Sequence, residues 1–243
     1  MSDITVFKFC GVNKNLLESL VRSQLYFARP ENLNDPYDCQ VDLTKSLERA
    51  ISLATDERKV VLQQALQGRT IFGQINNDIK NFGVCSFSAT LLNQALWAHY
   101  GDEHRGICLT YAIPEDFVND PSNSIFGFSG VNYGNDLLTE FFLNYQFDNT
   151  EADLSDFAID AMKIVLTNKS EDWKYEKEVR MIKPEPGPMK IPAEFLKQIC
   201  YGLRTSERDK GFVSELVNGK YANVVFAEFQ PGEANFEFRV VEI

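Results

Sequence analysis

The sequence is poor in the features that mark membrane, secreted and zinc-binding proteins. No stretch of its 243 residues approaches the ~20 apolar residues needed to cross a bilayer, and residues 1–4 carry no basic region followed by an apolar run. The five cysteines form no C-x-x-C pair and their number is odd, which argues against a zinc ribbon or a disulfide scaffold. We therefore expect a cytoplasmic protein with reduced thiols, no signal peptide and no membrane partner.

Positive charge and the common enzyme motifs are also scarce. The chain has 24 Lys and Arg residues against 35 Asp and Glu residues, a net charge of -11. The resulting field repels nucleic-acid phosphates, so a nucleic-acid partner is not favoured without a local basic patch. No G-x-S-x-G elbow, Walker loop or G-x-G-x-x-G fingerprint is present, which disfavours serine-hydrolase, P-loop and Rossmann chemistry.

The composition and patterning that remain are those of an α+β protein. With 44% hydrophobic and 24% charged residues, the chain is an ordinary globular one, and we expect a single domain over residues 1–243. Strand and helix patterns interleave irregularly, which predicts a mixed or split β-sheet with helices packed around it. Strands are predicted at 4–9, 25–27, 84–88, 107–111, 124–133, 173–182, 199–202, 223–229 and 236–243. Helices are predicted at 13–23, 44–67 with a break near 55–56, 70–82, 91–99, 136–145, 154–167 and 206–217.

Residues 173–182 carry the strongest functional signal, because they are predicted to form one strand with two different faces. At period 2, one face carries only charged side chains: Lys174, Glu176, Glu178 and Arg180. Two carboxylates and a guanidinium on a rigid strand can form a reaction centre, since neighbouring like charges push their pKa values apart. Two alternatives stay open: a solvated strand face with a surface ion pair, and a helix with Glu176 and Arg180 at i, i+4.

A polar loop at residues 34–38 is a second candidate. It places Asn34, Asp35 and Asp38 on a turn stiffened by Pro36, beyond a predicted strand that contains Tyr26. Loops at the end of a strand often carry function. The alternative is a turn in which the Asx side chains satisfy only their own backbone.

Residues 97–106 contain both histidines of the chain at the end of a predicted helix. Two histidines without an H-E-x-x-H pattern are too few for a metal site, so His99 is better interpreted as a hydrogen-bonding residue that positions a ligand. Trp97 and Tyr100 on the same segment are candidate substrate contacts, and we expect Trp97 and Trp173 to be largely buried. The alternative for His99 is a residue that only complements the helix dipole.

Taken together, these segments resemble a known family, the prokaryotic domain of unknown function 2971. The resemblance spans nearly the whole chain and rests on residues 7–9, 25–27, 34–38, 97–100, 104–109, Lys169, 173–180 and 199–202. One departure is Phe9, where many members carry Tyr, and this weakens a catalytic role for that position. The resemblance implies no established reaction, so it sharpens the site and leaves the function open.

Our leading hypothesis, by analogy, is an NAD-using ADP-ribosyltransferase-like enzyme, such as a bacterial toxin or phage-defence effector. In that superfamily a polar residue on the first strand, a middle aromatic or Ser/Thr strand and a late Glu-x-Glu strand hold NAD. Lys8, Tyr26 and the pair Glu176 and Glu178 follow such an order. The expected fold could then be ADP-ribosyltransferase-like, with a small nucleotide as substrate and a macromolecule as a possible acceptor.

Each charged residue has an expected role in this hypothesis. Departure of nicotinamide creates an oxocarbenium-like sugar, which Glu178 would stabilise from beneath. Glu176 would orient the acceptor, and Arg180 or His99 would bind the pyrophosphate. Lys174 would add a further substrate contact.

Two other function classes remain. One is a metal-dependent nuclease in which Asp35, Asp38, Asp172, Lys174 and Glu176 bind Mg²⁺ and a phosphodiester. The other is a non-catalytic sensor or interaction module of a defence operon. In every case we expect the charged segments around Lys8, 34–38, His99 and 176–180 to converge on one cleft. The sequence does not indicate an oligomeric state.

Overall fold

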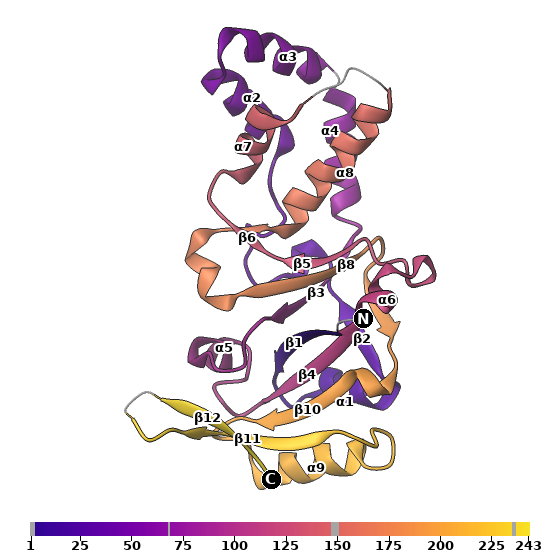
Figure 1. The fold of residues 1–243 in the computed structure, drawn as a ribbon, viewed down its shortest axis with the longest axis vertical. Coiled ribbons are helices and arrows are strands. Elements are labelled where there is room, and N and C mark those ends of the chain that lie inside the picture. The colour runs from indigo at the N-terminus through magenta and orange to yellow at the C-terminus, as the bar shows by residue number, and fades with distance from the viewer. Residues whose placement is uncertain (1–2, 68, 147–150, 235–236) are drawn as a thin grey trace.

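The largest element of the computed structural model is an eight-stranded sheet with the strand order β12-β11-β10-β4-β1-β3-β8-β5 (Figure 1). The structure describes residues 3–67, 69–146, 151–234 and 237–243. The strands of this sheet are β1 (Asp3–Cys10), β3 (Gly83–Ser88), β4 (Ile107–Pro114), β5 (Gly127–Gly130), β8 (Glu178–Lys183), β10 (Leu196–Tyr201), β11 (Val225–Pro231) and β12 (Phe238–Glu242). Neighbours are antiparallel except β10 and β11, so the expected mixed sheet of an α+β fold is confirmed.

The sheet is split between β1 and β3. Strand β1 pairs with β4 along its whole length, from Asp3 opposite Pro114 to Cys10 opposite Ile107, whereas it is registered with β3 only through Phe7 and Ser88. The two halves of the sheet therefore diverge at this point. One half contains β10, β4 and β1, with β11 and β12 at its edge, and the other contains β3, β8 and β5. Side chains, rather than backbone hydrogen bonds, must fill the opening.

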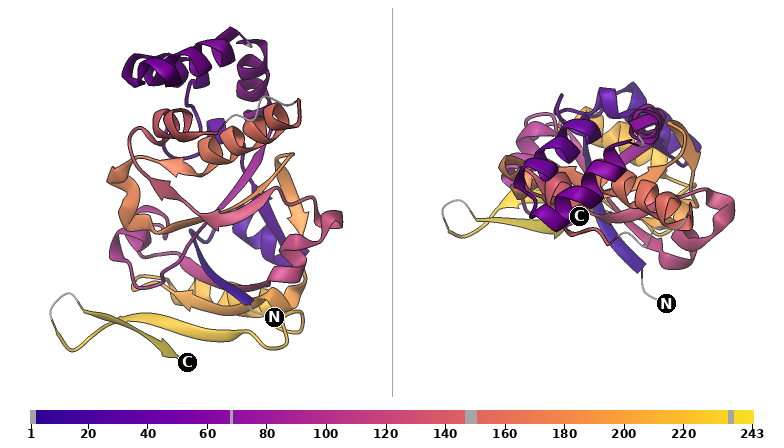
Figure 2. Two further views of the ribbon diagram at one scale, coloured as in Figure 1. Left: turned by 45° about the horizontal axis from the view of Figure 1, so that its top comes forward. Right: turned by 90° about the horizontal axis from the view of Figure 1, so that it is seen from above.

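Helices cover the two halves differently. The helices of the chain are α1 (Lys14–Arg22), α2 (Leu43–Leu53), α3 (Asp56–Gln67), α4 (Arg69–Ile79), α5 (Gln94–His99), α6 (Glu115–Asn119), α7 (Leu137–Asn144), α8 (Glu151–Thr167) and α9 (Glu207–Val217). Five of them, α2, α3, α4, α7 and α8, gather at one end of the molecule beyond β8, while α9 and the hairpin of β11 and β12 lie at the other end (Figures 1 and 2). The helical group, with Leu47, Phe72 and Phe142, shares its apolar core with Ile182 of β8.

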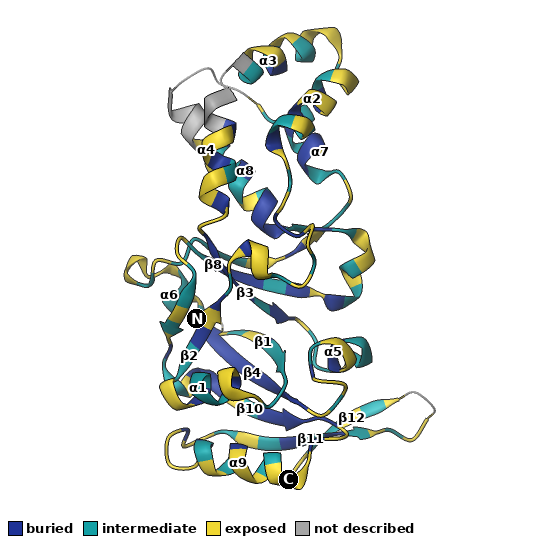
Figure 3. Cartoon of the chain, turned by 180° about the vertical axis from the view of Figure 1, so that it is seen from behind, coloured by how far each residue is buried: buried dark blue, intermediate teal, exposed yellow. Residues whose placement is uncertain are grey.

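Two smaller pairs of strands complete the fold. Strand β2 (Gln24–Phe27) pairs with β9 (Gly187–Lys190), and β6 (Asn132–Tyr133) pairs in parallel with β7 (Asn168–Lys169). The central strands of the large sheet, β3, β4 and β8, are mostly buried (Figure 3). In the described part of the chain, no helix is both long enough and apolar enough to cross a membrane.

Most elements agree with the sequence prediction, because their ends carry strong local signals. Helix α1 begins where Asn13 Oδ1 accepts hydrogen bonds from the backbone of Asn15 and Leu16, and it ends at Ser23 in the left-handed conformation. The break near residues 55–56 separates α2 from α3 as expected. Strand β9 was not predicted, because the proline cluster that leads into it indicates the end of the preceding strand. Phe236, at the start of the last predicted strand, lies outside the described residues.

The prediction of one strand over residues 173–182 is wrong for its first part. Residues Glu171–Glu176 form a 3-10 helix, η3, which begins where Ser170 Oγ accepts from the backbone N–H of Asp172. It ends at Lys177, whose φ of 46° is left-handed, and β8 starts at the next residue. The i, i+4 helix through Arg180 is excluded as well. A Ser cap followed by two acidic residues favours a helical first turn, and this local signal outweighs the alternation of charges.

Candidate functional site

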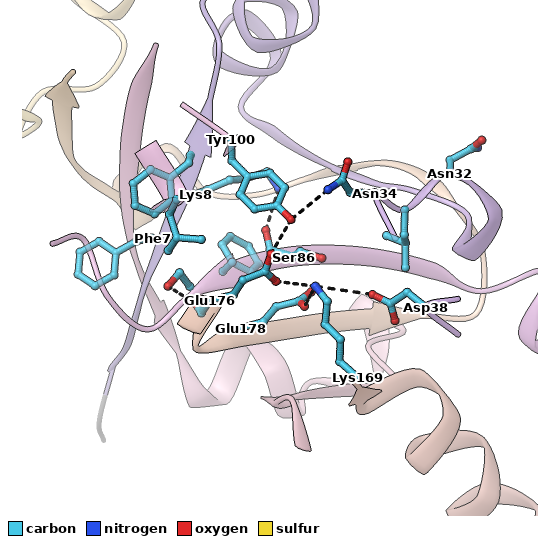
Figure 4. Close-up of a pocket in the computed structure, with 15 residues that line it drawn as sticks. Phe7, Lys8, Asn32, Asn34, Asp38, Ser86, Tyr100, Lys169, Glu176 and Glu178 are labelled. Carbon is cyan, nitrogen blue, oxygen red and sulfur yellow. Dashed lines mark hydrogen bonds and ion pairs between the residues drawn. The ribbon is translucent and has the colours of Figure 1, made fainter. Parts of the chain in front are cut away.

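A cavity of about 200 Å³ lies where the sheet splits. Its walls come from both halves: Phe7 and Lys8 on β1, and Ser86 and Phe87 on β3 (Figure 4). The Lys8 ammonium spans the opening and donates to the Ser86 carbonyl at 3.0 Å. Residues from the loop before α2, from the end of α5 and from the region of η3 and β8 close the remaining sides: Asn34, Asp38, Tyr100, Lys169, Glu176 and Glu178.

Five charged side chains form a network at the base of this cavity, and we call Asp38, Lys169, Glu176, Glu178 and Arg180 the ion network. Lys169 Nζ lies 2.5 Å from Glu176 Oε2 and 2.9 Å from Glu178 Oε2. Arg180 donates through Nη2 to Asp38 at 2.5 Å and through Nε to Glu178 at 2.8 Å. All five residues are buried, and Arg180 is 0% exposed. The alternative of a solvated strand face is therefore wrong.

The network keeps Glu178 ionised. Burial acts to raise the pKa of Glu178, but the charge and hydrogen bonds of Arg180, together with the Lys169 ammonium, outweigh it and lower that pKa to about 2. Burial acts to lower the pKa of Lys169, while Glu178 and Glu176 raise it, and the net shift is upward. The ion network has three carboxylates against two cations, and the Lys8 ammonium in the cavity wall balances this difference.

Tyr100 connects the ion network to the wall of the cavity. Its hydroxyl donates to Glu176 Oε1 at 2.6 Å and accepts from Asn34 Nδ2 at 3.4 Å. Burial and the hydrogen bond to Glu176 raise the pKa of this phenol, so it stays protonated at neutral pH. Tyr100 therefore acts as a fixed donor to Glu176.

The left-handed turn at Lys177 brings Glu176 and Glu178 to the same lysine, although one ends a 3-10 helix and the other begins a strand. Backbone contacts hold this turn in place: Ser88 Oγ donates to the Glu176 carbonyl at 2.7 Å, and the Ala89 N–H donates to the Lys177 carbonyl at 2.8 Å. On the other side, the Glu178 N–H donates to the Tyr133 hydroxyl at 2.7 Å. The carboxylates are thus positioned by both β3 and β6.

Six of the residues predicted from the sequence line the cavity. They are Lys8, Asn34, Asp38, Tyr100, Glu176 and Glu178. Arg180 lies behind them, where it also donates to the Leu166 carbonyl at 2.8 Å. All four segments expected to converge therefore do so, although the segment around His99 contributes Tyr100 and not His99 itself.

Two predicted residues lie elsewhere, for different reasons. The Lys174 side chain is 67% exposed and pairs with Glu171 at 2.5 Å, since η3 turns it away from the ion network. Tyr26 is 57% exposed on β2 and borders a different hollow, beside α1.

Three others have local roles. Trp97 is fully buried as expected, but its indole N–H donates to the Leu91 carbonyl at 3.1 Å and its ring belongs to the core. His99 is exposed beside Tyr100. Asp35 Oδ1 accepts from the Tyr37 N–H at 2.9 Å, the Asx turn that was the alternative. Trp173, expected to be largely buried, is only half-buried.

The sequence prediction missed Lys169, Ser86 and Ser88 as site residues. Lys169 follows directly on the apolar end of α8, and its side chain is buried among carboxylates. It belongs to the pattern that carries the family resemblance, which was the available signal. No sequence signal marked the serines of β3 as site residues, because their strand is predicted as ordinary core.

The ligand set expected for Mg²⁺ does not assemble. Of its five residues only Asp38 and Glu176 border the cavity, and both carboxylates are already bound by Lys169 or Arg180. Asp172 is exposed on η3. Within the described ranges, no group of three or more His, Cys, Asp or Glu residues is placed to hold a metal ion.

Comparison with known proteins identifies one family. The model described as "Protein of unknown function (DUF2971)" matches residues 96–181, a stretch that contains Tyr100, Lys169 and Arg180. Residues 96–181 are thus DUF2971-like, and the resemblance seen in the sequence is confirmed for this stretch. No curated protein and no solved structure matches the chain.

Proposed function

We propose that the protein is an NAD-using ADP-ribosyltransferase-like enzyme, acting as a toxin or defence effector. The observation that carries the proposal is a pair of buried carboxylates, Glu176 and Glu178, at the base of a cavity that opens in the split of the sheet. Breaking the bond between nicotinamide and ribose develops positive charge on the sugar, and a fixed negative charge beneath it lowers the barrier.

The order of the strands supports the analogy. Lys8 lies on β1, Ser86 and Ser88 lie on β3, and Glu178 lies on β8, and these three strands are neighbours in the sheet. This is the order of polar first strand, Ser/Thr strand and Glu strand that the superfamily uses to hold NAD. The serines of β3 take the place that the sequence prediction gave to Tyr26. A shared architecture alone does not imply a shared function, so the analogy rests on the side chains of the site.

The cavity suits the reactive end of NAD. Its volume of about 200 Å³ is below the roughly 300 to 1,000 Å³ of pockets that enclose a whole ligand, so a complete dinucleotide cannot enter. The nicotinamide and its ribose would lie inside, against Phe7, Phe87 and Tyr100, and the phosphates would lie outside. Aromatic faces favour a cationic pyridinium ring.

The two glutamates would have different roles. Glu178 accepts hydrogen bonds from Arg180 and Lys169 and stays ionised, so it would supply the fixed charge beneath the sugar. Among the described residues, the Glu176 carboxylate accepts from Tyr100 and Lys169, which leaves about two of its roughly four acceptor positions for a hydroxyl of the ribose or the acceptor. Arg180 is too deeply buried to bind pyrophosphate and would position Glu178, which leaves exposed His99 as the candidate for that contact.

The test is release of nicotinamide from NAD by the purified protein, measured with toxicity on expression in a bacterial host. Tyr100→Phe keeps every ion pair and removes the donor to Glu176 together with the acceptor for Asn34, so we expect turnover to fall roughly tenfold with the fold intact. Glu178→Gln and Glu176→Gln should each lower turnover by ~10² or more.

Glu171→Gln is the matched control, because it removes a carboxylate from the same segment at an exposed position. Its turnover should equal that of the natural protein. Urea unfolding of each variant separates lost chemistry from lost folding. If the natural protein releases no nicotinamide, or if all variants keep full turnover, the ion network is structural and a non-catalytic interaction module is the better interpretation.

A further inference from the structure

A smaller cavity lies beside α1, and we call it the α1 hollow. Its wall includes Lys8, Asn13, Asn15, Ser19, Gln24 and Tyr26, and its volume is about 170 Å³. Lys8 also lines the cavity at the split of the sheet, the first cavity, so the two cavities adjoin at this side chain. Neither volume alone reaches the roughly 300 to 1,000 Å³ that is usual for a site enclosing a whole ligand, whereas about 200 Å³ and about 170 Å³ together do. A ligand that extends past Lys8 from one cavity into the other therefore has enough room.

The wall of the α1 hollow differs in charge from the rest of the chain. The sequence has 35 Asp and Glu residues against 24 Lys and Arg residues. Among the described residues that line the hollow, however, none is Asp or Glu, and Lys8 is the single Lys or Arg. The wall thus has a net positive charge in an acidic protein, which suits an anionic part of a ligand.

The half-buried Lys8 ammonium has hydrogen-bonding capacity left for such a ligand. It donates to the Ser86 carbonyl at 3.0 Å. Within the described ranges it forms no ion pair with a carboxylate of the chain, unlike Lys169, which contacts two of them. An ammonium can donate three hydrogen bonds, so Lys8 can also donate to an anion placed where the two cavities adjoin.

The other polar side chains of the hollow add donors without adding negative charge. Asn13 Oδ1 already accepts from the backbone N–H groups of Asn15 and Leu16, so its Nδ2 amine is the part left to meet a ligand. The carboxamide of Gln24 and the phenol of Tyr26, which is 57% exposed, supply further donors from β2. A lysine surrounded by neutral donors, with no carboxylate to compete, is an arrangement that binds phosphate groups.

We propose that the α1 hollow binds the diphosphate of the same dinucleotide whose nicotinamide end lies in the first cavity. The proposal rests on the proposed function for the place of the nicotinamide ribose. Lys8 would donate to the phosphate next to that ribose, and Asn13, Gln24 and Tyr26 would donate to the phosphates from the wall of the hollow. Exposed His99, the other candidate for this contact, lines neither cavity. Tyr26 would then be a substrate contact, although it lies outside the first cavity.

The experiment is calorimetric titration of the full chain with NAD, nicotinamide riboside and inorganic pyrophosphate. The double variant Asn15→Asp/Gln24→Glu adds two carboxylates to the hollow at unchanged side-chain size, and an Asp in the first turn of α1 also suits the helix dipole. It should bind NAD and pyrophosphate at least tenfold more weakly than the natural protein, because the phosphates would meet like charges nearby. Nicotinamide riboside carries no phosphate, so its binding should be unchanged.

Gln63→Glu/Gln64→Glu is the matched control, since it adds the same two charges at exposed positions of α3, outside both cavities. It should bind all three compounds like the natural protein. Urea unfolding shows whether each variant is folded. If Asn15→Asp/Gln24→Glu does not fold, Tyr26→Glu at its exposed position gives the same decision: weaker NAD binding by it supports the proposal, and undiminished binding overturns it.

The outcomes separate the diphosphate site from the proposed reaction. Unchanged binding of NAD and pyrophosphate by Asn15→Asp/Gln24→Glu would overturn the diphosphate site, even if the protein cleaves NAD. Loss of NAD binding in His99→Ala but not in the double variant would overturn it as well, and would place the diphosphate outside the hollow. If the protein neither binds nor cleaves NAD, but binds pyrophosphate and loses this binding in the double variant, the site is supported and only the proposed function is contradicted.

Discussion

Two acid–base pairs a few residues apart show how little an ion pair's distance says about its strength. Glu171 and Lys174 on η3 are 2.5 Å apart with side chains 48% and 67% exposed, whereas Glu178 and Arg180 on β8 are 2.8 Å apart with side chains 5% and 0% exposed. Water screens the first pair, and such surface pairs contribute about 0 to 1 kcal/mol. The second pair has no water to replace a lost partner, so each charge depends on the other.

The difference between the pairs comes from their neighbours in space. Strand β8 is covered on both edges, by β3 and β5, and Arg180 also meets Asp38 and the carbonyl at the end of α8. The η3 segment lies outside the sheet, and Glu171 and Lys174 on it extend into solvent, although Glu176 at its end is buried. Charged residues of one short segment therefore give one solvated pair and one buried network.

Removing Arg180 should have the largest effect. Arg180→Met leaves Asp38 and Glu178 buried with Lys169 as their only cation, and breaking such a pair costs about 3 to 5 kcal/mol. Urea unfolding should show this loss, while the matched Lys174→Met should lose less than about 1 kcal/mol. Equal small losses in both variants would mean that water reaches the ion network.

Lowering the pH should also destabilise the buried pair more than the exposed pair. The expected loss of stability is somewhat smaller than that for Arg180→Met. The pKa of Glu178 is depressed from its ordinary value of 4.5 to about 2, so its contribution to stability is complete above pH 4.5 and is lost as the pH falls toward 2. The loss should amount to roughly 3 kcal/mol, as each pKa unit corresponds to about 1.4 kcal/mol.

The free energy of unfolding, measured between pH 6 and pH 2, should therefore depend less on pH in Glu178→Gln than in the natural protein. Glu171→Gln should retain the slope of the natural protein, because its carboxylate is exposed. A natural protein whose stability does not change over this range would show that Glu178 is not held ionised in the folded state.

The smallest effect is expected at the aromatic ring of Trp173. Trp173 is half-buried, and the Lys169 ammonium lies 5.0 Å from its ring centroid. Trp173→Ala should therefore cost roughly 1 to 2 kcal/mol, the range of a partly desolvated cation–π contact. Trp97→Ala, at a fully buried ring, should cost about 3 to 5 kcal/mol. A larger loss for Trp173 than for Trp97 would contradict the burial of the two rings.

Local signals were enough to predict most of the fold. Helices α1 and α9 begin at Asn13 and Ser206, side chains that accept from the first turn, and capping residues of this kind can be recognised in a sequence. Continuous apolar runs likewise marked β3 and β4, whose burial does not depend on which face they present.

The candidate site could be predicted only in part, since its geometry depends on contacts far apart in the chain. Whether Glu176 and Glu178 face water or a partner is decided by Asp38 and Lys169, which come from other elements. The split between β1 and β3 is also non-local, and without it the serines of β3 give no sign that they border a cavity. The sequence indicated which charged residues could belong to a site, but it did not indicate which residues they would pair with.

The split sheet also determines when the candidate site can form during synthesis of the chain. Its two halves are interleaved along the chain: β1 comes first, β3 precedes β4, and β8 follows only at Glu178–Lys183. At roughly 5 to 20 residues per second, a ribosome needs about ten to forty seconds to reach that strand. Until then Lys8, Asp38 and the serines of β3 have no carboxylate strand to face. A nascent chain therefore lacks the complete candidate site until Lys183, the last residue of β8, has been made.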